Sequence, residues 1–104
     1  MIGKYKVVHL IGSTKGNKEK FIAAEKYFTK KGYIAFKPVF YDLKENDPNM
    51  DIYNDMCYEK LLFCDIVCIV TPNHIGNSTK IRIKQAKHLN KEILVFECNT
   101  IRRY

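Results

Sequence analysis

Tryptophan is absent from this 104-residue sequence, which also contains only five glycines and three prolines. No apolar run is long enough to cross a bilayer, and the first residues lack the basic and apolar segments of a secretory signal. No repeat, linker or low-complexity tract divides the chain. We therefore expect a single domain spanning residues 1–104, cytoplasmic and without membrane contact.

Several chemical motifs are also missing. The phosphate-binding pattern GxxxxGK[ST] and the dinucleotide pattern GxGxxG do not occur, so the sequence does not favour a nucleoside triphosphatase or a dinucleotide enzyme. The four cysteines form no CxxC pair and the three histidines are scattered. We predict no metal site and no cofactor, and we expect Cys64 and Cys68 to be buried free thiols.

A formal charge of +7 is the main compositional bias. Four lysines recur at helical spacing and predict one exposed stripe on the last helix: Lys80, Lys84, Lys87 and Lys91. No aromatic residues interleave with this stripe, so a nucleic-acid partner is not favoured. A small anionic ligand fits the charge, and a basic protein-interaction domain remains an alternative.

Apolar runs alternate with amphipathic segments along the chain. They predict strands at 6–11, 33–37, 66–70 and 93–96, and helices at about 18–31, 51–63 and 79–89. Gly32 stands where the first helix should end. The expected fold is a small Rossmann-like or flavodoxin-like α/β three-layer sandwich. Its parallel sheet has four strands in the order 2-1-3-4, with room for a fifth.

Two polar turns follow the first and third strands, at residues 12–17 and 71–78. In a sheet of this order they lie side by side at the carboxyl edge, where open α/β folds bind ligands. Ser78 and Thr79 are expected to cap the following helix, whose free amides suit an anion. The alternative is that Asn73, Asn77 and Ser78 are ordinary turn and cap residues.

The layout of these residues resembles the nucleoside 2-deoxyribosyltransferase-like superfamily. The similarity rests on a first strand ending in Gly12-Ser13, on Gly32-Tyr33 before a strand closed by Pro38, and on Ile75-Gly76-Asn77-Ser78-Thr79 before a helix. The resemblance implies a flavodoxin-like domain, often a homodimer, that handles a small nucleoside or nucleotide and cleaves or transfers at the N-glycosidic bond. It implies a ligand site formed by Gly12, Ser13, Thr14, Lys15, Asn73, Gly76, Ser78, Thr79 and Arg82.

One position departs from the family pattern. Three residues after the threonine, family members carry a nucleophilic glutamate, whereas this sequence has Arg82. A guanidinium repels the positive charge that develops at the anomeric carbon, so family chemistry is not available at this residue. Arg82 should lie on the sheet-facing side of its helix with Ile83, Ala86 and Leu89. It either binds an anion or points to water or to an acid such as Asp42.

Three hypotheses therefore remain. The first is a glycosidase or transferase with a displaced carboxylate, for which Asp42 and Glu97 are the candidates and Glu45 and Asp51 are further possibilities. The second is a nucleotide-binding module that has lost its nucleophile, and the third is the basic interaction domain. Asp65, at the opposite edge of the sheet, is expected to orient structure. The stretch 39–51 is either a ligand-covering loop or a plain surface loop.

Overall fold

The computed structural model describes residues 1–38 and 46–104. Its elements follow the predicted alternation and add a strand at the end. In chain order they are β1 (Val7–Ile11), α1 (Lys18–Lys30), β2 (Ile34–Phe36), α2 (Met50–Phe63), β3 (Ile66–Ile69), α3 (Asn77–His88), β4 (Glu92–Glu97) and β5 (Thr100–Arg103).

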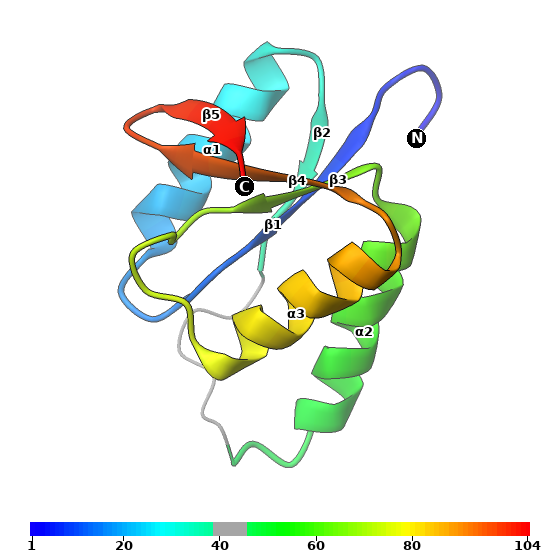
Figure 1. Cartoon of the computed structure of the whole chain (residues 1–104), viewed down its shortest axis with the longest axis vertical. Coiled ribbons are helices and arrows are strands. Elements are labelled where there is room, and N and C mark those ends of the chain that lie inside the picture. Colours follow the sequence, from blue (N-terminus) through cyan, green and yellow to red (C-terminus); the bar gives the residue numbers. More distant parts are fainter. Residues whose placement is uncertain (39–45) are drawn as a thin grey trace.

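The strands form one sheet with the order β2-β1-β3-β4-β5 (Figure 1). The predicted order of the first four strands is confirmed, and all of their pairings are parallel. The fifth strand pairs antiparallel with β4. Strand β1 is central, and His9 in its middle lies opposite Phe36 of β2 and Val67 of β3.

A tight hairpin turn connects β4 and β5. Its two central residues, Cys98 and Asn99, both have positive φ, at 54° and 59°. Two successive left-handed residues are the mark of a type I′ turn, whose usual sequence signals are Asn-Gly and Asp-Gly. Because the Cys-Asn pair lacks this signal, the position of the fifth strand was not predicted from the sequence.

Helices cover both faces of the sheet (Figure 1). On one face, Phe21, Ala24 and Phe28 of α1 pack against Val8 and Leu10 of β1. Burying these side chains is the main driving force for the layered fold.

The opposite face is covered by α2 and α3. Leu61, Ile83 and Ala86 of these helices pack there with Val7 and Ile11 of β1. Because successive side chains of a strand alternate between faces, His9 shares this face with Val7 and Ile11.

The ends of α1 and α3 show why the chain turns where it does. Gly32 has φ of 85° and follows α1, and the amide of Tyr33 donates to the carbonyl of Phe28, as expected for a helix that ends at a glycine. Asn90, with φ of 58°, has the same role after α3. The predicted stop at Gly32 is confirmed.

The start of α3 differs from the prediction. The helix begins at Asn77 with Gly76 as its N-cap residue, and no side chain caps it. Ser78 and Thr79 are therefore helical residues, and the prediction that they cap the helix was wrong. Glycine at the N-cap leaves the first amides of α3 without a side-chain acceptor.

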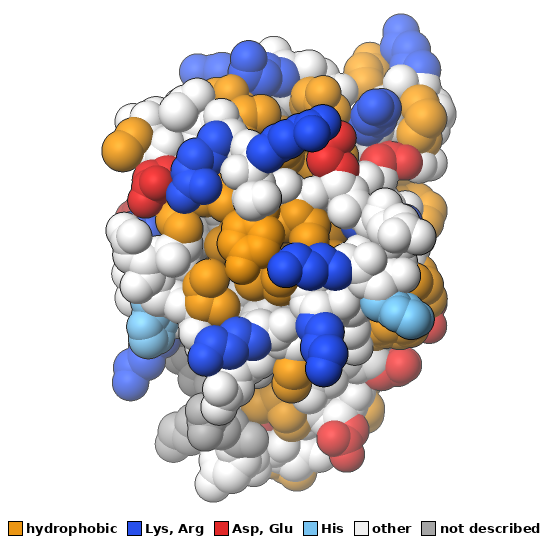
Figure 2. Space-filling view, viewed as in Figure 1, with side chains coloured by type: hydrophobic (Ala, Val, Ile, Leu, Met, Phe, Trp, Pro, Cys, Tyr) orange, Lys and Arg blue, Asp and Glu red, His pale blue; other side chains and the backbone are white. Residues whose placement is uncertain are grey.

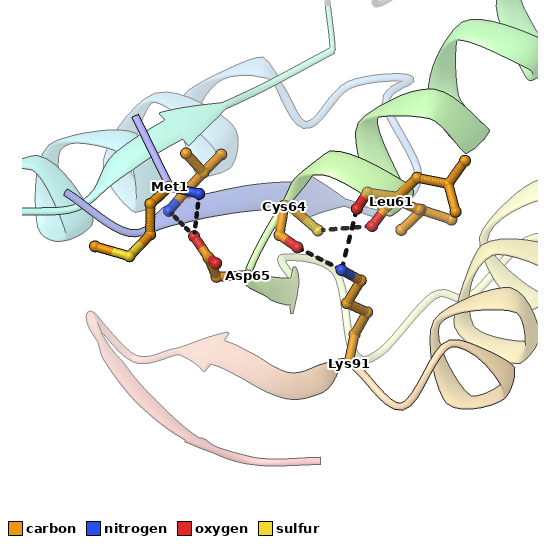
Figure 3. Close-up of polar contacts among 7 residues, drawn as sticks. Met1, Leu61, Cys64, Asp65 and Lys91 are labelled. Atoms are coloured by element: carbon orange, nitrogen blue, oxygen red, sulfur yellow. Dashed lines mark hydrogen bonds and ion pairs between the residues drawn. The ribbon is translucent and has the colours of Figure 1, made fainter. Parts of the chain in front are cut away.

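Hydrogen bonds and an ion pair hold the amino edge of the sheet together (Figure 3). The Asp65 carboxylate accepts the amide of Val7 at 2.8 Å and pairs with the amino group of Met1 at 3.2 Å. The Val7 amide is the main reason that the pKa of Asp65 lies below its usual value. Lys91 donates to the carbonyl of Cys64 at 2.7 Å. The prediction that Asp65 orients structure is confirmed, while Lys91 binds backbone instead of continuing the exposed stripe.

Candidate functional site

The turns after β1 and β3 meet at the carboxyl edge of the sheet, as predicted. The hydroxyl oxygen of Thr71 accepts the amide of Ser13 at 2.9 Å and donates to the carbonyl of His74 at 3.1 Å. Gly12 has φ of 151°, and a β-carbon there would lie 2.7 Å from this oxygen. The closeness of the two turns therefore depends on a glycine at position 12.

Beside these turns is a partly open cavity of about 250 Å³, bordered by β1, α2 and α3. Its polar lining comes from residues far apart in the sequence: His9, Gly12, Thr14, Asn54, Lys60, Ser78, Thr79 and Arg82. Its apolar lining includes Pro38, Met50, Tyr53 and Met56. A cavity with apolar walls and a few polar groups is typical of a small-molecule site.

The predicted ligand-binding residues are divided by this geometry. Five of them line the cavity: Gly12, Thr14, Ser78, Thr79 and Arg82. Thr79 is buried, whereas Ser78 is exposed at its rim.

The other predicted residues lie outside the cavity lining. The amide of Ser13 is bonded to Thr71, and Gly76 precedes α3 as its N-cap. Lys15 and Asn73 are exposed. Their predicted contact with a ligand therefore has no support from the cavity.

Of the candidate acids, those that the structure describes do not line this cavity. Glu97 ends β4 and pairs with Arg102 at 3.4 Å, a partly exposed contact within the terminal hairpin. Asp51 is exposed in the first turn of α2, and Asp42 and Glu45 lie outside the described residues. Among the described residues that line the cavity there is no aspartate or glutamate.

Arg82 reaches sideways from α3 to α2. Its guanidinium donates to the carbonyl of Ser78 at 2.9 Å and to the side-chain oxygen of Asn54 at 3.0 Å. Ile83 and Ala86 face the sheet and are buried, but Arg82 is only half-buried. The prediction that it lies with them against the sheet was therefore wrong. Both acceptors are neutral, and no carboxylate of the described residues pairs with this cation.

His9 and Lys60 were not identified as site residues from the sequence. His9 is only 3% exposed, and its Nδ1 has no hydrogen-bond partner in the described part of the chain. Burial, followed by the charges of Lys60 and Arg82, lowers the pKa of His9 to about 3, so the imidazole is neutral near pH 7. A polar residue inside the apolar run 7–11 was the available signal.

Lys60 lies one helical turn after Cys57 on α2, so the two side chains share a face toward the cavity. It is half-buried, and it makes no ion pair or side-chain hydrogen bond with the described residues. Tyr53 precedes Lys60 by seven residues, or about two helical turns, and this spacing was the sequence signal for a shared face.

The thiols and histidines do not form a metal site in residues 1–38 and 46–104. Cys64 and Cys68 are buried free thiols, as predicted. Burial raises the pKa of both thiols, that of Cys68 to about 12, and so disfavours their reactive thiolate forms. None of the described helices is long and apolar enough to span a bilayer.

A second, shallower hollow lies beside α3. It is lined by Ile75, Ile83 and Tyr104 and bordered by Lys80, Lys84 and Lys87. Figure 2 shows hydrophobic side chains surrounded by basic ones on this face. The ammonium of Lys87 lies 5.3 Å from the centre of the Tyr104 ring, a cation–π distance.

Residues 6–95 match the family model described as "Domain of unknown function (DUF4406)". The chain belongs to this family. A search of curated proteins gives no match.

The DUF4406 chain is also similar to a solved structure, "Structure of Clostridium botulinum CMP N-glycosidase, BcmB". The two share 18% sequence identity with a TM-score of 0.63, over 86% of this chain and 66% of that one. At this identity the similarity establishes the fold. The DUF4406 chain thus spans just under two thirds of the length of that protein.

Proposed function

We propose that this protein binds a small nucleoside or nucleotide in the cavity between β1, α2 and α3, and that it does not cleave the N-glycosidic bond. The observation that carries the proposal is the set of basic side chains in an otherwise mostly apolar cavity. Arg82, Lys60 and the neutral His9 line it, without an aspartate or glutamate from the described residues.

No aspartate or glutamate from residues 1–38 and 46–104 belongs to this lining, which argues against cleavage. Breaking the bond through a covalent intermediate requires a carboxylate beside an oxocarbenium-like centre. The nucleoside 2-deoxyribosyltransferase-like superfamily, which the sequence resembles, has that glutamate at the position of Arg82. Here the Arg82 guanidinium donates hydrogen bonds to Asn54 and Ser78. A cation there opposes the transition state and favours an anionic ligand.

The dimensions of the cavity indicate the size of the ligand. Its volume of about 250 Å³ lies just below the range of roughly 300–1,000 Å³ that is typical of sites for drug-sized molecules. A single nucleoside or nucleoside monophosphate therefore suits it better than a dinucleotide. Met50 and Met56 supply apolar surface for a flat base.

The similar fold suggests which ligand to test first. The similar structure is named a CMP N-glycosidase, so CMP and cytidine are the first compounds to test. Ligand binding to the native state raises its stability by about 2.7 kcal/mol when the ligand is at one hundred times its Kd. For a domain of this size the melting temperature should then rise by roughly 10 °C.

The experiment combines thermal shift with chromatography for released cytosine. Stabilisation by CMP with intact ligand after incubation is the expected result. Release of cytosine would overturn the claim that the bond is not cleaved, and it would direct attention to Asp42. No stabilisation by CMP, cytidine or other nucleosides and monophosphates would overturn the proposed binding function.

The proposal includes a homodimer. Helix α2 exposes four large apolar side chains at its surface, Ile52 (54%), Met56 (55%), Leu62 (42%) and Phe63 (50%). Burying such a face against a second copy is a common route to a symmetric dimer. Light scattering after size exclusion should give twice the monomer mass of 12.2 kDa. A monomer at all concentrations would contradict it.

A further inference from the structure

Two cations from the neighbouring helices α2 and α3 line the cavity and lack an anionic partner in the described residues. Lys60 projects from α2 and makes no side-chain hydrogen bond or ion pair there. Arg82 projects from α3 and is held only by two neutral oxygens. Half-buried cations are normally paired, because partial removal from water penalises an isolated charge.

The buried imidazole of His9 lies within the field of both cations, since the charges of Lys60 and Arg82 each act on its pKa. Its Nδ1 has no partner in the described residues, although a buried polar atom without a hydrogen bond costs about 1–3 kcal/mol. Three side chains from β1, α2 and α3 thus border one cavity: His9, Lys60 and Arg82. Together they offer a ligand an unpaired imidazole nitrogen and two positive charges without an anionic partner in the described residues.

We infer that Lys60 and Arg82 form a two-sided clamp for the phosphate of a nucleoside monophosphate, with His9 as a neutral hydrogen-bonding group beside it. This inference rests on the proposed nucleotide-binding function and names the ligand class and the residues that select it. A phosphate replaces the weaker neutral acceptors of the Arg82 guanidinium with charge-assisted hydrogen bonds.

The clamp gives the ligand a direction. Lys60 lies near the end of α2, which leads to the amino edge of the sheet, whereas Met50 begins that helix near the carboxyl edge. A phosphate at Lys60 and Arg82 therefore leaves the sugar and base toward Gly12, Thr14 and Met50. The resemblance alone implied a ligand site that includes Ser78 and Thr79 but not Lys60.

The test measures the Kd of CMP and of cytidine by calorimetry for the wild type, Lys60→Met, Arg82→Met and Lys84→Met. Lys84 is an exposed lysine of α3 outside this cavity, so its variant controls for net charge. Each clamp variant should weaken CMP binding about tenfold or more, as expected for loss of a hydrogen bond to a charged group, while cytidine affinity stays within about twofold. Lys84→Met should leave both unchanged.

A second measurement follows the His9 ring by nuclear magnetic resonance. When CMP binds, its phosphate should offset the two cations and raise the pKa of His9 from about 3. Cytidine should not raise it, and neither should CMP added to the Lys60→Met Arg82→Met double variant. The comparison of CMP with cytidine in the wild type does not depend on the stability of any variant.

Two failures are distinguishable. If CMP and cytidine bind equally well and the clamp variants leave the ratio of their affinities unchanged, the clamp is overturned and the nucleotide-binding function stands. If the folded wild type binds neither these compounds nor any other nucleoside or monophosphate, both are overturned. If Lys60→Met and Lys84→Met weaken CMP binding equally, the effect is due to net charge, and the clamp is again overturned.

Discussion

The amino edge of the sheet and the cavity between β1, α2 and α3 use similar residues in opposite ways. At the amino edge, Lys91 donates to the carbonyls of Cys64 at 2.7 Å and Leu62 at 3.1 Å, and the Asp65 carboxylate accepts the amide of Val7. Beside the cavity between β1, α2 and α3, Lys60 has no such partner among the described residues, and Arg82 has only neutral ones. Satisfied polar groups stabilise the fold, whereas unsatisfied groups beside a cavity remain available to a ligand.

The difference has a physical basis. A hydrogen bond already made within the protein must be broken before a ligand uses the same group, so it lowers the net gain of binding. A partner-free cation next to a cavity avoids this cost, but it makes the empty site less stable than a paired one. The paired groups of the amino edge are therefore expected to stabilise the fold, and the partner-free cations beside the cavity to determine binding.

The largest effect on stability should come from Gly12, which holds the carboxyl-edge turns together. Gly12→Ala places a β-carbon 2.7 Å from the Thr71 hydroxyl at φ of 151°, a conformation that alanine rarely adopts. We expect a loss of about 2–3 kcal/mol in the free energy of unfolding, measured by urea denaturation.

Gly76→Ala is the matched control for this variant. No atom lies within 4 Å of a β-carbon at that position, and Gly76 has φ of −75°. Its stability should stay within about 0.5 kcal/mol of the wild type, apart from the small N-cap preference for glycine. If both variants lose the same free energy of unfolding, the close approach of the two turns does not depend on Gly12.

The next effect is the pH dependence of stability, to which His9 beside the cavity and Asp65 at the amino edge contribute in different pH ranges. The pKa of His9 is about 3 in the folded protein and 6.5 in the reference state. Between these values the unfolded state binds more protons, so stability is lost as the pH falls below 6.5. From pH 7 to pH 5 the loss should be about 2 kcal/mol.

His9→Gln removes this titration and should flatten the pH dependence in that range, measured by urea denaturation at each pH. The Asp65 carboxylate contributes in a lower window, because its pKa lies below its usual value of 3.8 and its stabilisation is lost as the pH falls through that region. Asp65→Asn should therefore leave the slope between pH 7 and pH 5 unchanged. A wild-type stability that is flat from pH 7 to pH 5 would contradict a buried neutral His9.

The smallest effect compares the two lysines directly. Lys91→Met removes two hydrogen bonds to carbonyls and should lower the free energy of unfolding by about 1 kcal/mol. Lys60→Met removes no such bond and relieves repulsion toward Arg82, so stability should be unchanged or slightly higher. Thermal denaturation without ligand measures both, and a greater loss for Lys60→Met would contradict the comparison between the amino edge and the cavity.

Local patterns identified most of the fold. The buried strands, the amphipathic stripe of α1 and the stop at Gly32 each depend on residues close together in the chain, so periodicity and glycine placement predicted them. The β5 hairpin was not placed, because Cys98-Asn99 adopts a turn usually signalled by glycine. The start of α3 was placed too late, because its N-cap is Gly76 rather than a hydroxyl side chain.

The sequence by itself determined the alternation of strands and helices, the order of the first four strands, the meeting of two turns at one edge, and the arginine at position 82. Only the tertiary structure brought His9, Lys60 and Arg82 to one cavity and paired Asp65 and Lys91 elsewhere. Helix and strand periods are encoded by neighbouring residues. Whether a buried polar group has a partner depends on how distant elements pack, which no local pattern specifies.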